Sequence, residues 1–114
     1  MTDVPSTIRV LVAEDNALER STLVDLLNAL GHMVVAEVAS GAEAIEHARQ
    51  LTPDAVLLDV HMPGASGVEA AEEIAHALPG TAVVLITGDL SLTLSSADVL
   101  RSTAVALLAK PTPP

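Results

Sequence analysis

A short aliphatic run that ends in an acid stands near the middle of the chain: Ala55-Val56-Leu57-Leu58-Asp59-Val60. Two further runs, residues 8–13 and 82–87, are also nearly continuous in aliphatic residues instead of alternating between apolar and polar ones. Such runs are typical of parallel strands that are covered on both faces. Residues 33–39 and 105–109 add two more short apolar runs. The sequence therefore predicts five strands.

The segments between these runs have helical spacing. Asn16 is a suitable N-cap for the first helix, and Gly31 closes it. The leucines of this helix are expected to lie broadly on one side of it: Leu18, Leu23, Leu26, Leu27 and Leu30. Two segments with the spacing of a capping box each open an Ala-rich helical stretch: Ser40-Gly41-Ala42-Glu43 and Ser66-Gly67-Val68-Glu69.

Alternating strands and helices predict an α/β domain with a parallel sheet and right-handed crossovers. A fourth helix is expected only over residues 95–101, because the leucines of residues 90–95 alternate with the period of a strand. The prolines of residues 110–114 preclude a further regular helix. We therefore expect one domain over residues 1–114, with a core at about 8–111, a Pro-rich end at 111–114 and no fifth helix.

Composition excludes several classes of function. The 114 residues contain no Cys, which rules out disulfides, thiolate metal sites and a Cys nucleophile. A net charge of −10 and the lack of aromatic residues argue against direct contact with nucleic acid or anionic lipid. No segment reaches the ~20 apolar residues of a membrane span, and the acidic N-terminus does not resemble a signal peptide. A soluble cytoplasmic domain is expected.

Chemically active residues follow four of the five predicted strands. Glu14 and Asp15 follow the first, and Asp59, Thr87 and Lys110 end the third, fourth and fifth. Because the carboxyl ends of parallel strands share one edge of the sheet, these side chains are expected to converge there.

Clustered carboxylates repel one another, by about 4 kcal/mol per pair at ~4 Å and an effective dielectric constant near 20. A hard divalent cation relieves this repulsion, and ligands that are all oxygen favour Mg²⁺, with Mn²⁺ as the second choice. Open positions on such a metal suit phosphoryl oxygens. Lys110 and Thr87 could then contact a phosphoryl group, and Asp59 could be the nucleophile that forms an acyl phosphate.

These residues together resemble the receiver domain of two-component response regulators. The resemblance rests on Glu14-Asp15, on Leu-Leu-Asp-Val-His-Met-Pro-Gly at residues 57–64 with Gly67 after it, on Thr87-Gly88 and on Lys110-Pro111. It extends from about Ile8 to Pro111, nearly the whole chain. It implies a CheY-like, flavodoxin-like fold, a doubly wound parallel sheet of five strands in the order 2-1-3-4-5.

The resemblance also implies a metal site. Asp15, Asp59 and the backbone carbonyl of His61 would be ligands of Mg²⁺, and Glu14 would hold a water molecule of the metal. Asp59 would accept the phosphoryl group from a sensor histidine kinase, a phosphotransfer protein or a small donor such as acetyl phosphate.

The resemblance further implies a switch and its partners. Thr87 would bond the phosphoryl oxygens, and Lys110 would pair first with Asp59 and then with the phosphate. Phosphorylation would alter contacts with an output domain, an effector protein or a second copy of the chain. The chain would be a signalling phosphoacceptor and no enzyme beyond its own phosphorylation and dephosphorylation.

Other functions remain alternatives. A pseudo-receiver adaptor would use this fold for protein–protein interaction without phosphorylation; the complete acidic site argues against it, although Leu107 stands where the family usually has an aromatic residue or His. A phosphatase of the haloacid dehalogenase kind needs a carboxylate two residues after the nucleophile, where this chain has His61. A nucleotide-binding domain would need a Gly-rich phosphate loop, which this sequence lacks.

Overall fold

A computed structural model describes residues 7–62 and 67–87 and the backbone of residues 106–109. Five strands run parallel in one sheet: β1 (Arg9–Ala13), β2 (Met33–Val38), β3 (Ala55–Asp59), β4 (Ala82–Thr87) and β5 (Ala106–Ala109). Their order across the sheet is β2-β1-β3-β4-β5. The predicted α/β fold and strand order are confirmed, and each strand lies within one residue of the predicted run at either end.

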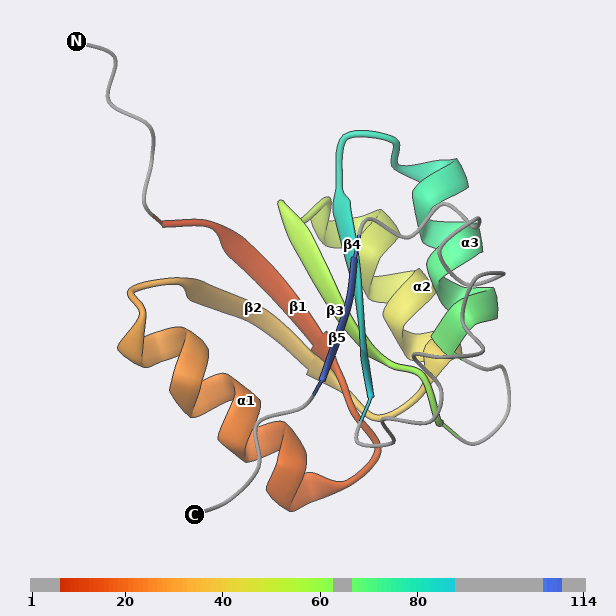
Figure 1. Ribbon diagram of the computed structural model, residues 1–114. Coiled ribbons are helices and arrows are strands. Elements are labelled where there is room, and N and C mark those ends of the chain that lie inside the picture. The colour runs from red at the N-terminus through yellow and green to blue at the C-terminus, as the bar shows by residue number, and fades with distance from the viewer. Residues whose placement is uncertain (1–6, 63–66, 88–105, 110–114) are drawn as a thin grey trace, which may run out of the picture.

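The described helices cover both faces of the sheet. Helix α1 (Ala17–Ala29) lies on one face, and helices α2 (Gly41–Leu51) and α3 (Gly67–Ala77) lie together on the other (Figure 1). Within the described part of the chain, no helix is long and apolar enough to cross a membrane. The predicted helix at residues 95–101 and the chain after Ala109, where a fifth helix was not expected, lie outside the described residues.

Apolar side chains fill both sides of the sheet. The larger cluster lies against α2 and α3 and includes Leu11, Val56, Leu58, Ile74 and Leu85. The smaller one lies against α1 and is formed by Val10, Val12, Leu23, Ala55 and Ile86. Side chains of β1 and β3 belong to both clusters, so both faces of these strands are covered. This explains why their sequences are continuously aliphatic, as expected for buried parallel strands.

Side-chain caps begin two of the helices as predicted. The Asn16 Oδ1 accepts a hydrogen bond from the Glu19 N–H at 2.9 Å. The Ser40 Oγ accepts from the Glu43 N–H at 3.2 Å and donates to the Glu43 carboxylate at 3.0 Å. Both acids also stand in a first helical turn, where the helix dipole favours negative charge. Ser66, the third predicted cap, lies outside the described residues.

The predicted leucine face of α1 is wrong in part. Leu23 is buried and Leu27 is half-buried, but Leu18, Leu26 and Leu30 are 77%, 45% and 62% exposed. At 3.6 residues per turn, the five residues from Leu18 to Leu23 turn the helix by about 140° beyond one full turn, so the two side chains point to different sides. The half-buried Val24 completes the packed face instead.

An extra residue interrupts the pairing of β1 with β2. Val10 pairs with Val34 and Leu11 pairs with Ala36, so Val35 is a β-bulge. The bulge reverses the alternation of the side chains along β2. Val34 packs on the α1 side, Ala36 and Val38 pack on the opposite side, and the Glu37 carboxylate comes close to Arg20 of α1.

Polar contacts hold the amino-terminal edge of the sheet together. The Arg9 N–H donates to the Asp54 carboxylate at 2.8 Å, and the Asp54 N–H donates to the Arg9 carbonyl at 2.9 Å. The Arg9 guanidinium donates to the carbonyls of Leu51 and Thr52 at 2.9 and 3.1 Å. A cation at the carboxyl end of α2 complements the helix dipole. Arg9 thereby joins β1 to the end of α2.

Thr52, the C-cap of α2, has a φ of 42° in the left-handed region, which a β-branched residue rarely adopts. We predict that Thr52→Gly raises the free energy of unfolding by roughly 0.5–1 kcal/mol. For a domain of this size, that is a rise of about 3 °C in Tm, measurable by thermal unfolding. Thr52→Val keeps the β-branched shape and serves as the control without a gain. An unchanged or lower Tm for Thr52→Gly would contradict the prediction.

Candidate functional site

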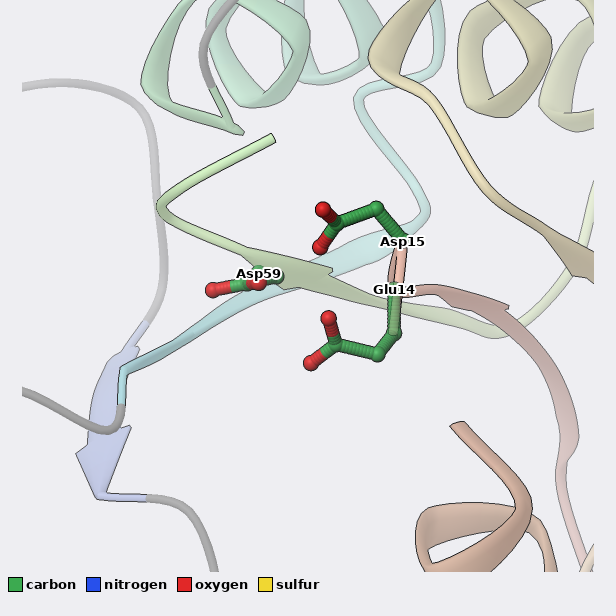
Figure 2. A group of neighbouring side chains, drawn as sticks. All are labelled: Glu14, Asp15 and Asp59. Carbon is green, nitrogen blue, oxygen red and sulfur yellow. The ribbon is translucent and has the colours of Figure 1, made fainter. Parts of the chain in front are cut away.

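Three carboxylates meet where β1 and β3 end. Glu14 follows β1 and is fully buried, Asp15 is exposed, and Asp59, the last residue of β3, is 3% exposed. One oxygen from each carboxylate lies within 4.8 Å of the other two. Figure 2 shows the Glu14 and Asp15 side chains leaving the chain on different sides, with both carboxylates turned toward the side where Asp59 lies. The sequence-based expectation that these acids converge is confirmed.

Backbone groups fix the carboxylates of this cluster. The His61 N–H donates to the Asp59 Oδ1 at 3.1 Å, and the Asn16 N–H donates to the Glu14 Oε2 at 3.1 Å. The Glu14 N–H donates to the Val38 carbonyl of β2 at 3.0 Å. Hydrogen bonds to the charged form of a carboxylate stabilise that form. Loops after β1 and β3 thus supply the donors that hold these acids in place.

The cluster has the chemistry of a site for a hard cation. Two ionised carboxylates within 4.8 Å repel by roughly 3–4 kcal/mol at an effective dielectric constant near 20, and burial of Glu14 and Asp59 limits screening by salt. All three side chains offer oxygen, the ligand that Mg²⁺ prefers. The donor set therefore fits a magnesium ion. The His61 N–H donates to Asp59, and the role of its carbonyl as a metal ligand, which the family resemblance implies, stays a prediction.

Thr87 lies close to this cluster through the pairing of the strands. It ends β4 and is fully buried, and its neighbour Ile86 pairs with Asp59. On its other side Thr87 pairs with Ala109, the last residue of β5. Lys110 comes next in the sequence and lies outside the described residues. The order of the strands therefore brings the ends of β3, β4 and β5 to one edge.

Gly67 fixes the distance between α3 and the end of β3. Its N–H donates to the Val60 carbonyl at 3.1 Å. A Cβ on this residue would collide with the carbonyl oxygen of Asp59 and would lie 2.9 Å from the Cα of Val60. Only glycine lets the helix begin this close to the backbone that carries Asp59.

One residue near the site was not singled out from the sequence. Arg20 of α1 donates from its Nη1 to the Glu14 carbonyl at 2.9 Å. A signal was present, because helical side chains point back toward the amino terminus of their helix, and Arg20 stands four residues after the N-cap Asn16.

Comparison with known proteins identifies the family. A sequence model described as the response regulator receiver domain matches residues 10–114. The chain belongs to the response regulator receiver family. Receiver domains of this family are phosphorylated on an aspartate and bind Mg²⁺ in an acidic pocket, and they interact with histidine kinases or phosphotransfer proteins.

Individual relatives of the receiver domain agree with this assignment. The chain is 46% identical over 77 residues to the transcriptional regulatory protein PdtaR of Mycobacterium tuberculosis, covering 68% of this chain and 38% of PdtaR. It is 37% identical over 111 residues to a protein-glutamate methylesterase/protein-glutamine glutaminase of Myxococcus xanthus, covering 94% of this chain and 31% of that protein. The chain thus spans less than two-fifths of these relatives, and in the methylesterase it corresponds to the receiver part alone.

A solved receiver structure has the same fold. The signal receiver domain of the response regulator NarL from Mycobacterium tuberculosis superposes with a TM-score of 0.82 at 32% sequence identity. The superposition covers 96% of this chain and 88% of that one.

The close approach at Gly67 generates a prediction about stability. Gly67→Ala should lower the free energy of unfolding by roughly 1–3 kcal/mol, because the backbone of Asp59 and Val60 must move to admit the methyl group. Urea unfolding measures the change. Gly80→Ala is the matched control, since a Cβ at Gly80 meets nothing within 4 Å. Equal free energies of unfolding for the two variants would mean that the backbone near Gly67 has room for a methyl group.

The repulsion within the acidic cluster generates a second prediction. Without metal, Asp59→Asn should raise the free energy of unfolding by about 1–2 kcal/mol, because one of the two buried charges is removed while the acceptor for the His61 N–H remains. With Mg²⁺ at 100 times its Kd, wild type should gain about 2.7 kcal/mol and the variant much less.

Denaturant titrations with and without Mg²⁺ measure both effects. Asp25→Asn, an exposed acid on α1, is the control and should change stability by less than about 0.5 kcal/mol. A metal-free Asp59→Asn protein less stable than wild type would show that repulsion does not dominate at this site.

Proposed function

We propose that this receiver domain accepts a phosphoryl group on Asp59 in a reaction that requires Mg²⁺, and that phosphorylation switches its contacts with other proteins. The observation that supports this most directly is the convergence of Glu14, Asp15 and Asp59 within 4.8 Å at the carboxyl edge of the sheet. A cluster of this charge suits a divalent cation, and the cation in turn suits the oxygens of a phosphoryl group.

The proposed metal site uses Asp15, Asp59 and the backbone carbonyl of His61 as ligands, with Glu14 beside them. Bound Mg²⁺ supplies positive charge, which lets an anionic phosphoryl group approach an anionic carboxylate. The hydrogen bond from the His61 N–H to the Asp59 Oδ1 fixes the plane of the nucleophilic carboxylate before the donor arrives. Such preorganisation lowers the cost of reaching the reactive geometry.

In the proposed transfer, an oxygen of Asp59 forms a bond to phosphorus. The bond from phosphorus to the nitrogen of a donor phosphohistidine, or to the oxygen of acetyl phosphate, breaks, and its electron pair leaves with the donor. The Thr87 hydroxyl, on the strand next to Asp59, donates to a phosphoryl oxygen. Lys110 provides the balancing ammonium group.

The partners follow from the same proposal. A sensor histidine kinase or a phosphotransfer protein supplies the phosphoryl group, and an output domain, an effector protein or a second copy of the chain receives the signal. The chain covers only 38% and 31% of two curated relatives, which bear the names of a transcriptional regulator and of a methylesterase. We further propose one receiver domain over residues 1–114, in the cytoplasm, with no catalytic activity on other substrates.

The proposal predicts the outcome of incubating the chain with Mg²⁺ and acetyl phosphate. Intact-mass spectrometry should find one added phosphoryl group that hydroxylamine removes, as expected of an acyl phosphate. Asp59→Asn and a metal-free sample should gain none. Lys110→Ala should still bind Mg²⁺ but take up the phosphoryl group more slowly.

Two results would contradict parts of this proposal. Uptake by Asp59→Asn would mean that another residue is the nucleophile. Wild-type protein that neither takes up phosphate nor binds Mg²⁺ in a titration would instead be a pseudo-receiver, and the search would turn to a protein that it binds without phosphorylation.

A further inference from the structure

A cation contacts the backbone of the acidic cluster. Arg20 is one of only five basic residues in a chain with 15 acids, and its side chain is 24% exposed. Its guanidinium donates to the main-chain carbonyl of Glu14, at 2.9 Å.

This contact restrains the peptide group that links Glu14 to Asp15. The Glu14 N–H is bonded to the Val38 carbonyl, the Glu14 carbonyl to Arg20, and the Glu14 Oε2 to the N–H of Asn16. A peptide group is planar, so fixing its carbonyl also fixes the direction in which the following Cα continues. Asp15 is exposed and stands in a loop between β1 and α1, and Arg20 fixes the backbone from which its carboxylate extends.

Arg20 is itself held in its position. Its backbone N–H donates to the Asn16 carbonyl at 2.9 Å, within the first turns of α1. Its Nε lies 4.0 Å from the Glu37 Oε1, on the edge strand β2. A partly exposed ion pair at this distance adds little stability. The side chain thus connects α1 and β2 to the end of β1.

The charge of Arg20 and its hydrogen bond to the Glu14 carbonyl are expected to affect the binding of a cation in opposite directions. As a positive charge near the cluster, Arg20 weakens the attraction of the site for a metal ion. As a donor that orders the Glu14–Asp15 backbone, it reduces the freedom that a carboxylate ligand must lose when the ion binds. The sign of the change on removing Arg20 therefore distinguishes the two roles.

We propose that Arg20 is a positioning residue for the metal site, which acts by fixing the Glu14–Asp15 peptide group and not by its charge. The inference deepens the proposed function and rests on it for the identity of the cation. Arg20 is also expected to order the loop after β1 in the metal-free chain.

The test compares four forms of the 114-residue chain: wild type, Arg20→Met, Arg20→Lys and Arg49→Met. Methionine keeps the apolar stem of Arg20 without charge or donor, and lysine keeps both. Arg49 is an exposed arginine in the last turn of α2 and serves as the charge control. Titration calorimetry measures the Kd for Mg²⁺, and hydrogen exchange by NMR measures the Asn16 amide in metal-free protein.

The expected result is a Kd for Mg²⁺ roughly tenfold higher in Arg20→Met, as is common when a group that orients a ligand is removed. Arg20→Lys should recover most of this loss, and Arg49→Met should bind at least as tightly as wild type. The Asn16 amide should exchange several-fold faster in Arg20→Met alone. Circular dichroism confirms that each variant is folded, and if Arg20→Met is not, Arg20→Gln, which also removes the charge, takes its place in the same comparison.

Unchanged or tighter Mg²⁺ binding by Arg20→Met would overturn the inference, because Arg20 would then act only as an opposing charge. Failure of the proposed function is a separate outcome. If wild type binds Mg²⁺ without taking up phosphate, the comparison of Kd values still stands. If wild type binds no Mg²⁺, the Asn16 exchange decides, and an unchanged rate in Arg20→Met would overturn the inference.

Discussion

Repulsion between carboxylates is the constraint on which the site depends. The parallel arrangement of β1 and β3 brings Glu14 and Asp59 to the same edge of the sheet, where both are buried. Three donors face oxygens of Glu14 and Asp59: the N–H groups of Asn16 and His61 face their carboxylates, and the guanidinium of Arg20 faces the Glu14 carbonyl. The fold thus stores an unfavourable interaction that a bound cation can relieve.

The contacts at the amino-terminal ends of the strands differ in kind from those at the carboxyl ends. At the amino-terminal edge, the contacts of Arg9 with Asp54 and of the Thr81 hydroxyl with the Pro53 carbonyl, at 2.8 Å, connect loops that carry no acidic cluster. At the carboxyl edge the buried polar residues are acids and Thr87. Substitutions at the first edge are therefore expected to affect folding, whereas substitutions at the second are expected to affect the acidic site as well.

The sequence was sufficient to predict the strands, the caps at Asn16 and Ser40 and the convergence of acids around Asp59, because these depend on local patterns and on the rule that parallel strands end together. Three features needed coordinates. The helical period separates Leu18 from Leu23, but which of the two lies against the sheet depends on how α1 meets it. The bulge at Val35 occurs in an apolar stretch with no alternation to interrupt. Arg20 contacts a main-chain carbonyl, and because every residue has one, no residue type in the sequence marks this partner.

The bulge at Val35 has a consequence for the behaviour of the protein at high concentration. Strand β2 is an edge of the sheet, five of its six residues are apolar, and such an edge is a template on which strands of other molecules can add. Val35 interrupts the regular spacing of its backbone groups, and Glu37 places a charge near its end. Together with a net charge of −10, this irregular edge opposes growth into fibrils. A single inserted residue thus helps the molecule to resist aggregation.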